Sequence, residues 1–257
     1  MTDLLRYPRR ALFHAYEHVA MVVGLGFLAQ LCLLWLPFAL VLQPLLPRRW
    51  GQPLGRRTIA AGFRFYLWFL GVFCACRFDL SALDRLREER GLVVVANHPS
   101  LLDAVMIVSR LPNAVCVMKA ALMDNILVGA AARLARYIRN DAPLEMILGA
   151  REELRQGAHL VIFPEGSRTT RFPLDGLSAS AGLIAAKSKA PVQTVFIHFN
   201  SPYLGKVWPL FRKPDLPLYF SVRLGRRFEP PANVAAFTEE LEAYYRRELT
   251  SGPQSVS

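Results

Sequence analysis

The chain has 257 residues, 53% of them hydrophobic, and carries a formal net charge of +11. This length suffices for one large domain, or for a core domain with an appendage, and a mean hydropathy of +0.25 is high for a water-soluble enzyme. Apolar and basic residues together favour a protein that lies on an anionic membrane surface. Nucleic-acid binding is disfavoured because it needs basic residues interleaved with exposed aromatic rings, whereas most aromatic residues here lie in apolar runs.

Residues 1–78 contain two apolar segments. The first, residues 19–46, is almost wholly apolar, and Pro37 and Pro44 predict a kink or an early end of its helix. A basic bend follows at residues 47–57, and the second apolar segment spans residues 58–76. We therefore expect residues 1–78 to form a membrane-associated segment of two helices.

Two arrangements of these helices are compatible with the pattern. They either cross the bilayer as a hairpin or enter only one leaflet as a pair. Lys and Arg normally gather on the cytoplasmic side of spanning segments, but here both the N-terminus and the bend are rich in arginine. The one-leaflet arrangement keeps all these arginines near a single anionic surface, and the sequence favours it.

Strand and helix patterns alternate over residues 79–250. Short apolar runs bounded by turn residues predict strands at residues 92–96, 114–118, 159–163, 192–199 and 218–224. Helical patterns fall between and after them, at residues 104–108, 125–136, 143–156, 177–187 and 234–249. The alternation predicts an α/β domain with a mixed, largely parallel sheet flanked by helices. Residues 251–257 are expected to be a disordered tail.

The four cysteines favour a reducing compartment. Three of them lie inside strongly apolar stretches, which is typical of buried, reduced thiols. Neither a C-x-x-C pair nor a Cys/His spacing typical of zinc occurs, so we expect no metal site. The α/β domain is therefore expected in the cytoplasm.

Three of the predicted strands are followed directly by polar residues. These are Asn97 with His98, then Lys119, and then residues 164–168. Because functional sites of α/β sheets gather at the carboxyl ends of strands, this coincidence predicts a site.

His98 and Asp103 are the candidate catalytic pair. If a strand ends near Asn97 and a helix begins near Pro99 or Ser100, Asp103 lies about one turn into that helix and can face the imidazole. A carboxylate there holds one ring nitrogen and raises the basicity of the other. Ser100 lacks the G-x-S-x-G context of a nucleophile, so a helix-capping role is expected for it.

Two motifs resemble those of a known family. NHPSLLD at residues 97–103 and FPEGSRT at residues 163–169 resemble the first and third motifs of the glycerolipid acyltransferases, in particular the bacterial 1-acyl-glycerol-3-phosphate acyltransferase type. Residues 137–139 resemble the end of the second motif, and residues 190–192 the start of the fourth. The resemblance implies the fold of that family over residues 92–197.

The same resemblance implies a reaction. An acyl chain would move from a thioester, carried by acyl carrier protein or coenzyme A, to the free hydroxyl of a lysophospholipid such as 1-acyl-glycerol-3-phosphate. His98 would act as general base and Asp103 would orient it. The tetrahedral oxyanion needs donors, which backbone N–H groups near the strand end or in the Gly166 loop could supply. The thioester is a co-substrate, and no cofactor is expected.

The acceptor phosphate would need guanidinium groups, for which Arg139 and Arg168 are candidates and Lys119 is a third. The third motif, Glu165, Gly166, Ser167 and Arg168, is expected to bind substrate, with Glu165 contacting an acceptor hydroxyl or positioning Arg168. The expected location is the inner membrane, with the catalytic domain on its cytoplasmic face.

Two alternatives remain open. The same chemistry could act on another acceptor, such as a lyso-ornithine lipid or another hydroxylated lipid. A different class of function is a non-enzymatic, basic membrane-binding protein, for which replacement of His98 would leave function intact.

Overall fold

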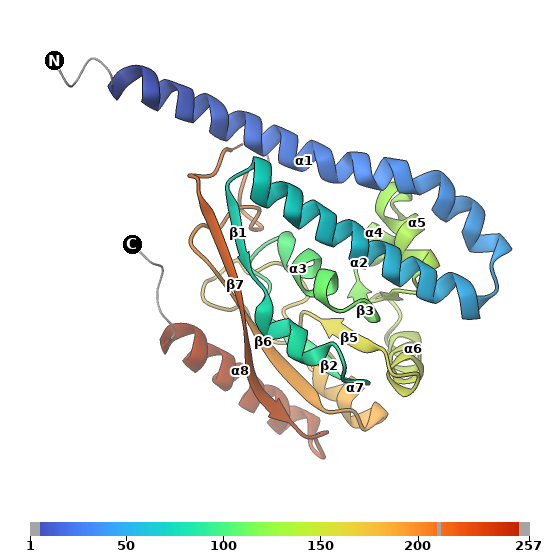
Figure 1. Ribbon diagram of the computed structural model, residues 1–257. Coiled ribbons are helices and arrows are strands. Elements are labelled where there is room, and N and C mark those ends of the chain that lie inside the picture. The colour runs from blue at the N-terminus through green and yellow to red at the C-terminus, as the bar shows by residue number, and fades with distance from the viewer. Residues whose placement is uncertain (1–5, 210–211, 252–257) are drawn as a thin grey trace.

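The computed structural model describes residues 6–209 and 212–251 (Figure 1). Its centre is a seven-stranded sheet with the strand order β1-β7-β6-β2-β5-β3-β4, in which β6 and β7 are antiparallel and the other neighbours are parallel. The predicted mixed, largely parallel sheet is thus confirmed. Its strands are β1 (Cys76–Asp79), β2 (Val93–Ala96), β3 (Ala114–Met118), β4 (Ile138–Arg139), β5 (His159–Ile162), β6 (Val192–Phe199) and β7 (Leu218–Phe228).

Helices cover both faces of the sheet. Helix α2 packs on α3, whereas α6, α7 and α8 contact one another in sequence and reach β5 and β2. Figure 1 shows α1 along the outside of the molecule beside α2, with the sheet and then α8 beyond. The helices are α1 (Arg6–Leu45), α2 (Arg48–Phe73), α3 (Leu102–Arg110), α4 (Ala120–Asp124), α5 (Ile126–Leu134), α6 (Pro143–Arg155), α7 (Ser180–Ser188) and α8 (Val234–Ser251), with a 3₁₀ turn, η1 (Ser81–Leu86).

Strand β2 lies near the middle of the sheet and is buried on both faces. All four of its residues are buried, and it pairs in parallel with β5 on one side and β6 on the other. A strand enclosed in this way needs apolar residues at every position rather than at alternate ones, which explains the continuous run of Val. Its carboxyl end is therefore held rigidly between two neighbours.

Two strand predictions need correction. Strand β1 was not predicted: the second apolar segment was expected to end at residue 76, and the boundary expected between residues 78 and 79 falls inside the strand. It joins the sheet because residues 218–221 of β7 offer it a parallel edge. Strand β7 in turn continues past residue 224, since its antiparallel pairing with β6 continues to Phe228.

The N-terminal helices also differ from expectation. Helix α1 continues through Pro37, and α2 starts at Arg48, so most of the expected bend at residues 47–57 is helical. A proline inside a helix costs about 3 kcal/mol. Here apolar side chains on both sides of Pro37, including Trp35 and Ala39, pack against α5 and offset that cost.

Helix α2 shares the core of the α/β domain. Tyr66, Leu67 and Leu70 are buried in the same apolar cluster as the central strands. Gly55 brings α2 so close to the end of α5 that an added Cβ would lie 2.8 Å from the backbone nitrogen of Ala135. The helix is therefore docked permanently on the domain.

Helix α1 contains one segment, Leu12–Leu45, that is long and apolar enough to cross a membrane by length and composition, with a mean hydropathy of 2.3. Its 34 residues span about 51 Å, more than the ~30 Å of a hydrocarbon core. Many large apolar side chains of α1 and α2 are exposed. They include Leu12, Phe13, Val19, Val22, Leu33, Leu34, Phe38, Val41, Leu45, Trp50, Leu54, Phe65, Trp68, Val72 and Phe73.

Two remaining expectations can be compared with the described residues. Helix α8 extends to Ser251, and the rest of the expected tail lies outside the described residues. All four cysteines are free, and Cys74, Cys76 and Cys116 are buried, as their apolar surroundings predicted.

Candidate active site

At the carboxyl end of β2, the side chain of Asn97 takes over the hydrogen bonds to the neighbouring strand β6. Asn97 is buried, and its amide bonds both backbone groups of Ile197: Oδ1 accepts from the N–H at 2.8 Å, and Nδ2 donates to the carbonyl at 3.0 Å. The side chain thus replaces a rung of the β2–β6 ladder and lets the main chain leave the sheet. His98 follows at this point and lies at the tip of the strand.

His98 and Asp103 form the pair that their spacing predicted. The imidazole Nδ1 lies 2.8 Å from Asp103 Oδ2, and Asp103 is in the first turn of α3. The imidazole stacks on the ring of Phe163 at a centroid distance of 4.1 Å. One nitrogen and one face of the ring are therefore held, while its side chain remains 19% exposed. Among the described residues, Nε2 has no hydrogen-bond partner.

Asp103 is fully buried, and this has an electrostatic consequence. Burial raises the pKa of its carboxyl to about 6, although the hydrogen bonds from His98 and from the Ser100 N–H (2.7 Å) act in the opposite direction. Its second oxygen, Oδ1, is buried and unpaired among the described residues. Keeping this carboxylate ionised therefore costs free energy. Because little solvent screens its negative charge, that charge acts strongly on the neighbouring imidazole.

Ser100 has the capping role expected of it. Its Oγ accepts from the N–H of Leu102 at 3.3 Å and donates to the carbonyl of Tyr203 at 3.0 Å. The side chain is buried. Both contacts occupy the hydroxyl, which is therefore not presented as a nucleophile.

Glu165 joins the two motif loops. Its Oε1 accepts from the backbone N–H of His98 at 2.8 Å, and its Oε2 accepts from the N–H of Asp175 at 3.0 Å. The N–H of Thr169 returns a bond of 2.7 Å to the carbonyl of His98. Burial raises the pKa of Glu165, and these N–H donors offset part of the effect. Glu165 therefore contacts His98 rather than Arg168, which differs from one of the two roles expected for it.

Arg168 is held by the loop between β6 and β7, of which the structure describes residues 200–209 and 212–217, called here the 200–217 loop. Its Nη1 donates to the carbonyls of Leu204 at 2.8 Å and Gly205 at 3.1 Å. The same loop carries Lys206, whose Nζ donates to Ser167 Oγ at 3.1 Å. The third motif is thus fixed on one side to His98 and on the other to this loop.

Gly166 shapes the turn of the third motif. Its φ is +68°, a conformation that favours glycine, and its N–H donates to the carbonyl of Phe163 at 3.0 Å. The N–H groups of Gly166 and His98 are both engaged, so an oxyanion donor from this region would have to be another backbone N–H.

The structure does not bring the other predicted cations into contact with His98. Lys119 is exposed at the start of α4, after β3. Arg139 lies on the edge strand β4, where its guanidinium pairs with Asp124 at 2.6 Å and Asp141 at 2.8 Å. Strands β5 and β3 separate β4 from β2, which corresponds to a distance of about 14 Å between the strands.

Sequence reasoning missed the 200–217 loop altogether. It acts through the carbonyls of Tyr203, Leu204 and Gly205, and a backbone carbonyl leaves no trace in the residue types. Asp175 was missed for the same reason, because its N–H makes the contact to Glu165. Phe163 could have been found, since it is the first residue of the third motif, FPEGSRT.

Comparisons with known proteins agree with this geometry. Residues 77–198, which include both motif loops, match the family model described as Acyltransferase. The fold resembles the crystal structure of the 1-acyl-sn-glycerophosphate (LPA) acyltransferase PlsC from Thermotoga maritima, with a TM-score of 0.68 and 17% sequence identity over 94% of this chain and 99% of that one. Comparison with curated proteins finds no match. The acyltransferase family model thus matches the part of the chain that holds both motif loops, and the chain shares the fold of PlsC.

Proposed function

We propose that the chain transfers an acyl chain from a thioester to the free hydroxyl of a lysophospholipid such as 1-acyl-glycerol-3-phosphate, with His98 as general base. The observation that carries the proposal is the His98–Asp103 pair at the tip of β2. One imidazole nitrogen is held by a buried carboxylate, and the other is free to take a proton. PlsC is named as a 1-acyl-sn-glycerophosphate (LPA) acyltransferase, and that acceptor belongs to the same substrate class.

The proposed transfer proceeds through attack on the thioester and collapse of a tetrahedral intermediate. His98 Nε2 removes the proton of the acceptor hydroxyl while the hydroxyl oxygen attacks the thioester carbonyl carbon. The tetrahedral intermediate collapses with cleavage of the C–S bond, and the imidazolium returns the proton to the leaving thiolate. Asp103 stabilises the imidazolium between these two steps. Because Ser100 Oγ is buried and bonded, the transfer is direct and forms no acyl-enzyme.

Arg168 is our proposed ligand for the acceptor phosphate. A guanidinium matches a phosphate with paired N–H donors, and Arg168 lies in the motif loop that Glu165 ties to His98. A cleft of about 450 Å³ opens beside this loop, with Thr169, Gly205, Lys206 and Trp208 among its lining residues, although neither Arg168 nor His98 lines it. Arg139, which two carboxylates neutralise, is better suited to a structural role.

Helices α1 and α2 support a one-leaflet association with the membrane. Helix α2 cannot be surrounded by lipid, because one of its faces is buried in the core shared with the sheet. Both helices instead expose apolar side chains, and Arg48, Arg49 and Arg57 are exposed in the first half of α2. Such a surface inserts beside anionic headgroups. We propose the cytoplasmic face of the inner membrane as its location, since the thioester donors are soluble.

The test is an acyl-transfer assay with purified protein. Acyl carrier protein and coenzyme A thioesters are each offered with lysophosphatidic acid, other lysophospholipids and a lyso-ornithine lipid. His98→Ala is expected to lower the rate by about 10³-fold, since general-base catalysis contributes about 10²–10⁴-fold. Ser100→Ala should lower it less than tenfold, and His18→Ala, at an exposed histidine of α1, should not change it. Full activity of His98→Ala would overturn the mechanism, and transfer to the lyso-ornithine lipid alone would replace the proposed acceptor.

Membrane association is expected to depend on the exposed face of α1. Replacement of Leu34 and Phe38, which are exposed on that helix, by Glu should weaken binding to anionic vesicles at least tenfold in a flotation assay. A charged side chain in the hydrocarbon region costs about 2.5–3.5 kcal/mol. The matched control replaces the exposed Leu144 and Leu148 of α6 in the same way. Equal losses in the two double variants would argue against a membrane-binding face on α1.

A further inference from the structure

Glu17 is an unusual residue for its surroundings. It is the only Asp, Glu, Lys or Arg in residues 12–45, which otherwise form the apolar part of α1. Its side chain is only 3% exposed, although most side chains around it on α1 face outward. A buried carboxylate costs several kcal/mol unless it is paired and hydrogen-bonded. The contacts of the Glu17 carboxylate therefore indicate its structural role.

The carboxylate of Glu17 is bonded mainly to the 200–217 loop. Its Oε2 pairs with Lys213 Nζ, and its Oε1 accepts from the backbone N–H of Leu216 at 3.2 Å. His14, one turn earlier on α1, approaches Oε2 with Nδ1 at 3.0 Å. The loop is thereby fastened to α1 through one buried acidic group.

The other end of the same loop holds the motif loops. Leu204 accepts from Leu101 N at 3.2 Å and from Arg168 Nη1 at 2.8 Å, and the Tyr203 carbonyl accepts from Ser100 Oγ at 3.0 Å. The loop therefore bonds α1 at one end, and the start of α3 and the third motif at the other.

Described contacts connect the two ends. Lys213 follows Arg212, whose carbonyl accepts from Trp208 Nε1 at 2.9 Å. The Trp208 ring meets the Tyr203 ring edge to face at a centroid distance of 5.9 Å. A displacement of Lys213 would therefore be transmitted through packed side chains to the carbonyls that hold Arg168.

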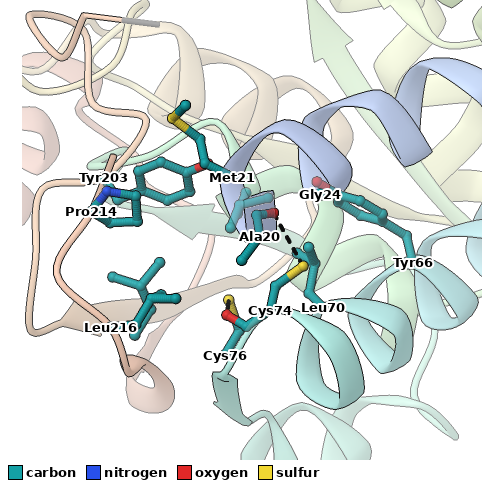
Figure 2. Close-up of a pocket in the computed structure, with 12 residues that line it drawn as sticks. Ala20, Met21, Gly24, Tyr66, Leu70, Cys74, Cys76, Tyr203, Pro214 and Leu216 are labelled. Carbon is teal, nitrogen blue, oxygen red and sulfur yellow. Dashed lines mark hydrogen bonds between the residues drawn. The ribbon is translucent and has the colours of Figure 1, made fainter. Parts of the chain in front are cut away.

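A small apolar pocket marks the place where α1 meets the loop. Figure 2 shows Tyr203, Pro214 and Leu216 of the loop gathered against Ala20 and Met21 of α1, one turn beyond Glu17. Leu102, the neighbour of Asp103, also lines this pocket. Residues of α1, of the 200–217 loop and of the first turn of α3 thus line the same pocket.

We propose that Glu17 is a positioning residue for acyl transfer: by fastening the 200–217 loop to α1, it holds the carbonyls that orient the Arg168 guanidinium toward the acceptor. Acceptor binding then depends on how the membrane-associated helix is seated. This inference rests on the proposed role of Arg168 as ligand of the acceptor phosphate.

The first test is Glu17→Gln. Glutamine keeps the volume and an oxygen for the Leu216 N–H, but its neutral amide leaves Lys213 with only the exposed Asp215, whose Oδ1 lies 4.0 Å from Nζ. We expect the KM for the lysolipid acceptor to rise about tenfold while kcat stays within threefold of wild type. Arg168→Lys should change the two constants in the same direction. A control of lower stability, Ile184→Val in α7, should lower the Tm and leave KM unchanged.

A double-variant cycle distinguishes an effect of the Glu17–Lys213 pair on acceptor binding from an effect on stability alone. Lys213→Met should raise KM like Glu17→Gln, and the double variant Glu17→Gln/Lys213→Met should raise it less than the product of the two, because it leaves no unpaired charge. Independent effects in the cycle, or a lower Tm with an unchanged KM, would overturn the proposal. If Glu17→Gln fails to fold, Lys213→Met alone decides by the same criterion. Absence of acyl transfer by the wild-type protein would instead count against the proposed function.

Discussion

Asp103→Asn is expected to make the protein more stable at pH 8 and nearly inactive. Burial raises the pKa of Asp103 from 3.8 to about 6, so the folded state favours the protonated carboxyl. The stability that this preference contributes is complete below pH 3.8 and is lost as the pH rises through about 6. At pH 8 the wild-type protein therefore keeps a buried carboxylate at a cost on the order of 3 kcal/mol.

Asparagine resembles the neutral acid at every pH. The variant should therefore be more stable than wild type by on the order of 3 kcal/mol at pH 8, and the difference should vanish near pH 4. Its acyl-transfer rate should fall by about 10²–10⁴-fold, because the amide no longer stabilises the imidazolium of His98. Denaturant unfolding in detergent at pH 8, 6 and 4, together with the assay at pH 8, measures both effects. A variant less stable than wild type at pH 8, or a gap independent of pH, would contradict the assignment.

Arg56→Met is expected to destabilise the protein by about 3–5 kcal/mol, the usual result when one partner of a buried ion pair is removed. The Arg56 side chain is only 4% exposed, and its Nη2 lies 2.6 Å from Glu153 Oε2 on α6. Its other nitrogens donate to Asn113 Oδ1 at 3.0 Å and to the Ala135 carbonyl at 3.1 Å. One guanidinium thus ties α2 to three separate parts of the α/β domain.

The neighbouring Arg57 provides the matched control. It lies on the same helix but is exposed, so Arg57→Met should change the stability by less than about 0.5 kcal/mol. The double variant Arg56→Met/Glu153→Leu should recover part of the loss, because it leaves no unpaired carboxylate. Denaturant unfolding measures all three. Equal stabilities of the Arg56 and Arg57 variants would show that α2 is held by apolar packing alone.

The buried arginine also bears on how the basic bend is interpreted. From the sequence, all arginines of residues 47–57 appeared available to a membrane surface. In the structure, Arg48, Arg49 and Arg57 are exposed, whereas Arg56 points into the domain. Nothing in the residue types distinguishes Arg56 from Arg57, because the difference lies in which face of α2 meets α5 and α6.

Local patterns were sufficient for most of the strands and for the catalytic pair. Short runs rich in apolar residues predicted β3 and β6 residue for residue, although β6 also contains Gln193, Thr194 and His198. The His98–Asp103 contact follows from a strand end and a helix start only five residues apart, and such short spacing leaves little freedom. These features depend on neighbours in the chain and were therefore determined by the sequence itself.

Contacts between distant segments were decided only by the tertiary structure. The β1–β7 pairing, the burial of Arg56, and the roles of Glu165 and Glu17 all join residues far apart in the chain, and several act through backbone N–H or carbonyl groups. Every residue except proline carries both groups, so the sequence contains no mark of which ones are used. The sequence determined that a histidine–aspartate pair would stand at the end of a buried strand. The tertiary structure decided which groups hold that pair and its third-motif arginine in place, because only packing selects partners among identical backbone groups.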